Sequence, residues 1–159
     1  MSVLSQFACS ACRKEEPPIT EEEIQELHPL VPSWKIVREE GVRKLLNRLS
    51  FDTEEQAKAF VERVMEHARK QNHHPVIDSG GADVSVAWWT HSIHDLHPND
   101  FIMAAKTDGA YEHIIVGAEG DMSADTPPPK LEEAPRFKRL IKKRNPTPPI
   151  NPGQDPAAP

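Results

Sequence analysis

The distribution of proline limits what this chain can fold into. Ten of the 16 prolines lie after residue 126. A segment with so much proline and so few apolar side chains cannot bury enough surface to offset the entropy of ordering. The 159 residues therefore predict three parts: a flexible leader over 1–17, one folded domain over 18–115 and a disordered tail over 116–159. A chain of this length is too short for a two-domain enzyme.

The charge of the chain also changes toward the tail. Residues 1–129 carry 12 Lys and Arg against 22 Asp and Glu, a net of −10, whereas residues 130–159 carry seven against three, a net of +4. The acidic segment over residues 1–129 is therefore a poor binding surface for nucleic acid. The sequence has no run of 18 apolar residues and no signal-peptide pattern at its start, so we expect a cytoplasmic protein without a membrane span.

A basic cluster in the tail is the candidate partner-binding segment. It either docks on an acidic protein partner or only keeps the chain soluble. Its members are Phe137, Lys138, Arg139, Leu140, Lys142, Lys143 and Arg144.

The two cysteines form one C-x-x-C motif in the polar leader. Cys9 and Cys12 do not lie between a strand and a helix, as a thioredoxin-like redox pair would. A zinc site needs two further ligands, and the usual second pair is absent. We interpret them as reduced thiols, with a redox site as the alternative.

Two capping boxes predict helix starts. Thr20 is followed by Glu23, and Thr53 by Gln56, each pair at the spacing of a capping box. The first helix is expected to end near Pro29 and the second to run over 53–72, before Pro75. The apolar stripe of the second helix consists of Ala57, Phe60, Val61, Val64, Met65 and Ala68.

Two hairpins and a third helix complete the predicted order. The helix is expected to start at Pro98. The four strands are expected over 34–38, 42–51, 76–78 and 84–90. This order predicts an α+β fold, α-β-β-α-β-β-α, in which helices cover one face of a four-stranded, mainly antiparallel sheet. The other face or an edge would be available for oligomerisation.

Five of the eight histidines lie close together in the sequence: His73, His74, His91, His94 and His97. Imidazoles serve as acid and base groups at neutral pH and also as metal ligands. The spacing of the last three, in a loop at i, i+3 and i+6, is not a zinc signature. We therefore predict neither a metal nor a cofactor.

The spacing of the histidines resembles a known motif. Asn72-His73-His74-Pro75, then fifteen residues to His91, which follows Thr90, then eight residues to Asp100, is similar to the motif of the pterin-4a-carbinolamine dehydratase family. Trp34, Leu49-Ser50-Phe51 and Leu96 also resemble the family, which extends the likeness over about residues 18–108.

The resemblance implies a homodimer or homotetramer in which three histidines serve a dehydration. The substrate would be 4a-hydroxytetrahydropterin and the product quinonoid dihydropterin. His73 and His91 would be the acid and the base, and His74 would bind or orient the substrate. Asp100 either takes part or simply complements a helix N-terminus.

Two positions depart from the family pattern. Arg69 replaces an acidic residue four positions before His73, so we expect a guanidinium one helical turn away that disfavours the acid form of that imidazole. Gly81 replaces an aromatic residue, so a ring wall for the pterin is expected to be missing. Trp89 either compensates as a binding residue or lies in an interface, and Arg69 is the second candidate binding residue.

The whole chain, with its C-x-x-C leader and proline-rich basic tail, is similar to the pterin-dehydratase-like Rubisco assembly factors of α-carboxysome gene clusters. This resemblance implies a chaperone with a degenerate pocket that is associated with carboxysomes and binds the Rubisco large subunit. The alternative is an active dehydratase, because a fold alone does not decide function.

Overall fold

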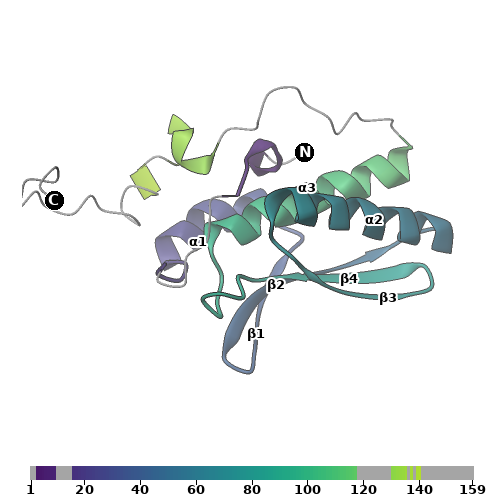
Figure 1. Ribbon diagram of the computed structural model, residues 1–159, viewed down its shortest axis with the longest axis horizontal. Helices are drawn as coiled ribbons and strands as arrows, with labels where there is room; N and C mark the ends of the chain where they lie inside the picture. The colour runs from purple at the N-terminus through teal and green to yellow at the C-terminus, as the bar shows by residue number, and fades with distance from the viewer. Residues whose placement is uncertain (1–2, 10–15, 118–129, 136, 138, 141–159) are drawn as a thin grey trace, which may run out of the picture.

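The computed structural model describes residues 3–9, 16–117, 130–135, 137, 139 and 140. Three α-helices cover one face of a four-stranded sheet (Figure 1). The strands are β1 (Lys35–Glu39), β2 (Val42–Ser50), β3 (Val76–Gly80) and β4 (Asp83–Trp88), and all neighbours are antiparallel in the order β1-β2-β4-β3. The predicted fold class is confirmed.

The helices begin where the sequence predicts. Helix α1 (Glu21–Leu27) and helix α2 (Glu54–Gln71) each have a complete capping box, formed by Thr20 with Glu23 and by Thr53 with Gln56. Helix α3 (Pro98–Val116) starts with proline in its first turn, where a missing N–H costs nothing. Short 3₁₀ turns, η2 (His28–Leu30) after α1 and η3 (Leu131–Glu133) in the tail, complete this part.

A two-residue loop closes the first hairpin. Glu40 and Gly41 have φ values of 51° and 82°, and positive φ at both loop residues is typical of a type I′ turn. The register that follows pairs Ile36 with Leu45 and Leu45 with Trp88 across three strands. One face of the sheet therefore carries the apolar side chains that meet the helices.

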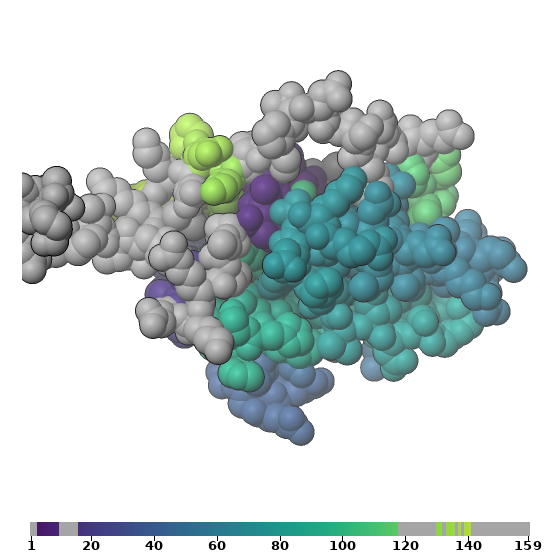
Figure 2. Space-filling view, in the orientation of Figure 1, coloured from purple at the N-terminus to yellow at the C-terminus, as the bar shows by residue number. Residues whose placement is uncertain are grey.

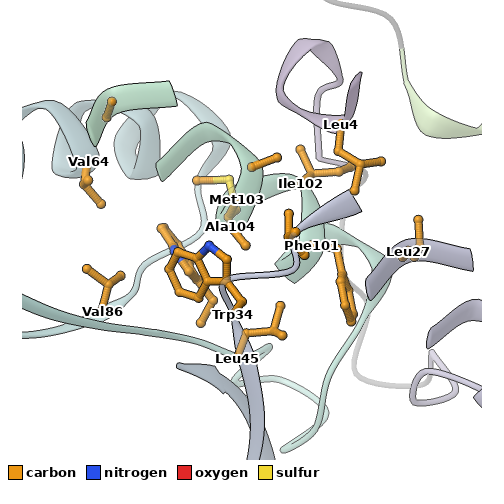
Figure 3. Packing of buried hydrophobic residues seen from close by; sticks show 14 of the residues in the cluster. Leu4, Leu27, Trp34, Leu45, Val64, Val86, Phe101, Ile102, Met103 and Ala104 are labelled. Atoms are coloured by element: carbon orange, nitrogen blue, oxygen red, sulfur yellow. The ribbon is translucent and has the colours of Figure 1, made fainter. Parts of the chain in front are cut away.

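The core lies between this face of the sheet and α3. Trp34 is 1% exposed and lies between the sheet residues Leu45 and Val86 and the helix residues Met103 and Ala104 (Figure 3). The indole Nε1–H of Trp34 donates to Asp108 Oδ1 (2.9 Å), which satisfies its one polar group. Helix α3 is buried over most of its length, so its first turn is held rigidly against the rest of the domain.

The described parts of the leader and tail lie against the outer side of the helices (Figure 2). The 3₁₀ turn η1 (Val3–Gln6) buries Leu4, and Phe7 meets Phe137 edge to face, with ring centroids 6.1 Å apart. A parallel bridge joins Ala8 to Lys130. Lys106 Nζ of α3 donates to the Ser5 carbonyl (2.8 Å), so the leader is fastened to the helix as well as to the tail.

Candidate functional site

A left-handed residue at the end of α2 sets the position of His73. Asn72 has a φ of 50°, a conformation that asparagine tolerates better than most residues. The His73 N–H donates to the Ala68 carbonyl (3.0 Å) and the Asn72 N–H to the Arg69 carbonyl (3.3 Å), which is a Schellman motif. The backbone thus leaves the helix axis at Asn72 and turns the His73 ring toward the start of α3.

Asp100 is the centre of the site. Its carboxylate is 0% exposed, and Oδ1 lies 2.6 Å from His73 Nε2. Oδ2 accepts from the Thr90 hydroxyl (2.9 Å) and from the His97 N–H (2.9 Å). Asp100 therefore both caps the first turn of α3 and holds the His73 ring.

Trp88 fixes the plane of the His73 ring. The two rings are stacked with centroids 5.6 Å apart and planes 10° from parallel. Trp88 is itself fixed, because its Nε1–H donates to the Thr107 hydroxyl (3.0 Å), which donates to the Met103 carbonyl (2.7 Å). The His73 imidazole is thus held both at its edge by Asp100 and on its face by an immobile ring.

His91 lies next to His73 and His74. Partial burial, followed by the charge of His73, lowers the pKa of His91, and the His74 backbone opposes this shift. The Trp89 ring lies 4.3 Å from that of His91, and Lys44 Nζ is 4.2 Å from the Trp89 centroid. The structure therefore brings together the four residues of the predicted motif, with His91 and His74 at the exposed side.

An ion pair positions the segment that carries Thr90 and His91. Arg43 donates from Nε to Asp95 Oδ1 (2.8 Å) and from Nη2 to Oδ2 (3.1 Å), a bidentate pair. The Thr90 N–H in turn donates to the Asp95 carbonyl (3.0 Å). The loop after β4 is closed at its base by these contacts, which keeps the Thr90 hydroxyl on Asp100.

The other two loop histidines point elsewhere. His94 is exposed with a φ of 51°, and His97 is 3% exposed and bonded to Glu16. Over the part of the chain that the structure describes, no three His, Cys, Asp or Glu side chains form a group that could hold a metal ion. In the same part of the chain, none of the helices is long and apolar enough to cross a membrane.

The expected position of Arg69 relative to His73 is wrong. Because α2 ends at Gln71 and Asn72 is left-handed, the two residues are not one helical turn apart on a common face. Arg69 is exposed. A contact between Arg69 and a substrate stays a prediction.

The expectation that Gly81 removes a ring wall from the site is also wrong, because position 81 does not lie beside the histidines. Gly81, with a φ of 62°, lies in the turn between β3 and β4, and nothing lies within 4 Å of the Cβ it would carry. The histidines lie at the opposite, open end of this hairpin, and a five-residue strand spans about 16 Å. A side chain here would face solvent at the turn rather than the histidines, so the glycine does not open the site.

The tail residues predicted to bind a partner differ in their surroundings. Phe137 and Leu140 are buried, at 1% and 8% exposure, whereas Arg139 is exposed. Lys138, Lys142, Lys143 and Arg144 lie outside the described residues, as does Cys12. Cys9 is described: its N–H donates to Gln71 Oε1 (2.7 Å) and its thiol lies 3.8 Å from the Asn99 carbonyl.

The sequence reasoning missed the residues that support the motif. Thr90 and His97 bond to Asp100, Trp88 stacks on His73 and Thr107 holds Trp88, but none of these contacts has a sequence spacing of its own. Only Thr90 carried a signal, because it directly precedes His91 in the motif.

Comparisons with known proteins agree with the motif. The family model described as "Pterin 4 alpha carbinolamine dehydratase" matches residues 17–110. A protein of Nitrosococcus oceani named "Putative pterin-4-alpha-carbinolamine dehydratase" is 45% identical over 113 residues, which are 71% of this chain and 100% of that protein. One of Chlorobium luteolum with the same name is 40% identical over 114 residues, 72% of this chain and 100% of that protein.

A solved structure has the same fold. The transcriptional coactivator/pterin dehydratase from Brucella melitensis matches with a TM-score of 0.54 and 24% identity, over 60% of this chain and 99% of that one. Together with the family model and the two relatives, this identifies the class: the chain belongs to the pterin-4a-carbinolamine dehydratase family.

Proposed function

We propose that the protein dehydrates 4a-hydroxytetrahydropterins to quinonoid dihydropterins. The observation that carries the proposal is the buried Asp100 carboxylate, which holds the His73 ring beside His91 and His74. In the reaction the C4a–O bond breaks, a proton joins the departing hydroxyl to form water, and N5 loses its proton as the C4a–N5 double bond forms. Two imidazoles in opposite protonation states can supply both proton transfers.

His73 is the proposed acid. Asp100 accepts from Thr90 and the His97 N–H as well, so it acts as an acceptor throughout and takes the Nε2–H of His73. A protonated His73 keeps this hydrogen bond and has a second proton, on Nδ1, to give to the leaving hydroxyl. Stacking on Trp88 keeps that nitrogen in a fixed direction.

His91 is the proposed base. Partial burial and the charge of His73 lower its pKa, which favours the neutral imidazole that can take the proton of N5. His74, exposed beside it, would contact the pterin, and Trp89 offers an aromatic ring next to His91.

The test compares His73→Asn and His91→Asn with His94→Asn. The first two remove the proposed acid and base, and each should lower the dehydration rate by about 100-fold. His94 is an exposed histidine of the same loop, and asparagine tolerates its left-handed backbone, so His94→Asn should retain the full rate. Equal rates for all three variants, or no dehydration by the unmodified protein, would contradict the proposal.

A second function, assistance to Rubisco assembly in a carboxysome setting, is favoured by a separate observation. The two relatives are covered over their whole length by 113 or 114 residues, so more than 40 residues of this chain have no counterpart in them. The family model ends at residue 110, and residues 130–159 carry a net charge of +4, which suits an acidic protein surface. Since Phe137 and Leu140 are buried, the basic side chains would make the contact.

Co-expression of Rubisco with charge-reversed variants tests this role. Lys142, Lys143 and Arg144 are changed to Glu, and the matched control reverses three exposed basic residues of the domain, Arg48, Lys58 and Lys70. The tail variant should lower the yield of assembled Rubisco and its binding to the large subunit, whereas the control should not. The Rubisco role is wrong if co-expression with the unmodified chain yields no more assembled Rubisco than expression without the chain. His73→Asn should leave the yield unchanged, which separates the two functions.

A further inference from the structure

A buried histidine that the dehydration does not use lies directly before helix α3. His97 is 3% exposed and is the N-cap residue of the helix. Its backbone N–H donates to Asp100 Oδ2 (2.9 Å), and its ring Nδ1 accepts from the Asn99 N–H (3.1 Å). Its other ring nitrogen, Nε2, is hydrogen-bonded to Glu16 Oε2. His97 thus joins the end of the leader to the turn that presents Asp100.

These contacts define the tautomer of His97. Nδ1 can accept from Asn99 only if it carries no proton, so the ring proton is on Nε2. The Glu16 carboxylate accepts that proton and thereby favours this tautomer over the one with the proton on Nδ1. With a proton on Nδ1, the Asn99 N–H would face a donor and the side-chain cap would be lost.

The cap bears on His73 through Asp100. The first turn of α3 places Asp100 at the third helical position, where one carboxylate oxygen meets the His97 N–H and the other meets His73. A change in this turn therefore moves the oxygen that lies 2.6 Å from the proposed acid. Small displacements of an orienting group are costly in catalysis.

We propose that His97 is a positioning residue of the dehydration site: its Nδ1 caps α3, Glu16 selects the tautomer that can do so, and the capped turn holds Asp100 on His73. This inference rests on the proposed dehydratase function. It assigns to Glu16, in the leader, an effect on the dehydration that acts through His97.

Two substitutions test the two ring nitrogens of His97 separately. In His97→Asn the amide oxygen stands where Nδ1 was and can accept from Asn99, whereas the contact with Glu16 is lost. In His97→Gln the amide nitrogen reaches toward Glu16, whereas no acceptor remains near Asn99. The proposal requires Asp100 to stay in place on His73 in the His97→Asn variant and to shift in the His97→Gln variant.

Glu16→Ala, made in two backgrounds, tests the tautomer. In the protein with His97, removing Glu16 frees the ring proton to move to Nδ1, so the dehydration rate should fall by about threefold to tenfold. In the His97→Asn background the amide oxygen is an acceptor regardless of Glu16. Glu16→Ala should therefore have no further effect there.

The readouts are the dehydration kinetics and the NMR signal of the His73 Nε2 proton, assigned by its loss in His73→Asn. His97→Gln should shift or remove this signal and lower kcat about tenfold with KM within about twofold, while His97→Asn leaves both close to the unmodified protein. The proposal is overturned if His97→Gln leaves the His73 signal unchanged, or if His97→Asn lowers kcat as much as His97→Gln does. It is also overturned if Glu16→Ala lowers the rate equally in both backgrounds. If the unmodified protein does not dehydrate the pterin, the proposed function fails, and the His73 signal alone then decides whether His97 positions it.

Discussion

Two aspartates eight positions apart on α3 have opposite surroundings. Asp100, at the first turn, is fully buried and accepts from His73, Thr90 and the His97 N–H. Asp108, in the middle of the helix, is partly buried and accepts from Trp34 Nε1, and burial raises its pKa to about 6. A buried carboxylate needs several donors to replace water, and only Asp100 has them. The comparison separates an acceptor built into the site from a side chain that mainly supports a core tryptophan.

The largest effect is expected from Asp100→Ala. It leaves the Thr90 hydroxyl, the His97 N–H and the His73 ring without their acceptor in a buried place. Each buried donor without a partner costs about 1–3 kcal/mol, so the free energy of unfolding should fall by about 3–5 kcal/mol in urea denaturation. A loss below about 1 kcal/mol would mean that Asp100 is not the centre of this group of contacts.

Thr90→Val removes one of the three donors without changing the shape of the side chain. The carboxylate keeps two partners, so the loss should be about 1–2 kcal/mol, smaller than for Asp100→Ala. The double variant Asp100→Ala with Thr90→Val measures their coupling by the same denaturation. Because the hydroxyl has no acceptor once Asp100 is gone, the second substitution should then cost little, and full additivity would contradict the contact.

Asp108→Asn should have the smallest effect and the opposite sign. The amide oxygen can still accept from Trp34, but no charge has to be desolvated. Because the folded pKa of about 6 lies above the usual 3.8, the unmodified protein loses stability as the pH rises from about 4 to about 6. The variant should therefore gain about 1 kcal/mol at pH 8, after allowance for solvent screening, and nothing at pH 4. If the variant and the unmodified protein differ in stability by the same amount at both pH values, burial does not destabilise the charged Asp108 carboxylate.

The sequence predicts most of the fold because the signals for it are local. The capping residues Thr20 and Thr53, the apolar stripe of α2 and the loop Glu40-Gly41 act within a few residues of their own position. The motif spacing likewise brings His73, His91 and Asp100 into one site, since hairpins and helices of fixed length join them.

The remaining features depend on contacts that spacing does not encode. One left-handed residue, Asn72, removes the helical relation between Arg69 and His73 that the sequence suggested. The contacts of Phe7 with Phe137 and of Glu16 with His97 join segments far apart in the chain, and composition alone does not reveal them.

Dehydration of 4a-hydroxytetrahydropterin by the unmodified protein, Asp100→Asn and Asp108→Asn tests the central claim most directly. In Asp100→Asn an amide NH₂ replaces one of the two oxygens, so His73 and the pair Thr90 and His97 cannot all keep an acceptor. We expect kcat to fall about 100-fold in Asp100→Asn and to stay within about twofold in Asp108→Asn. Equal rates in the two variants, or an inactive unmodified protein, would contradict the assignment of Asp100 as the residue that holds the acid in place.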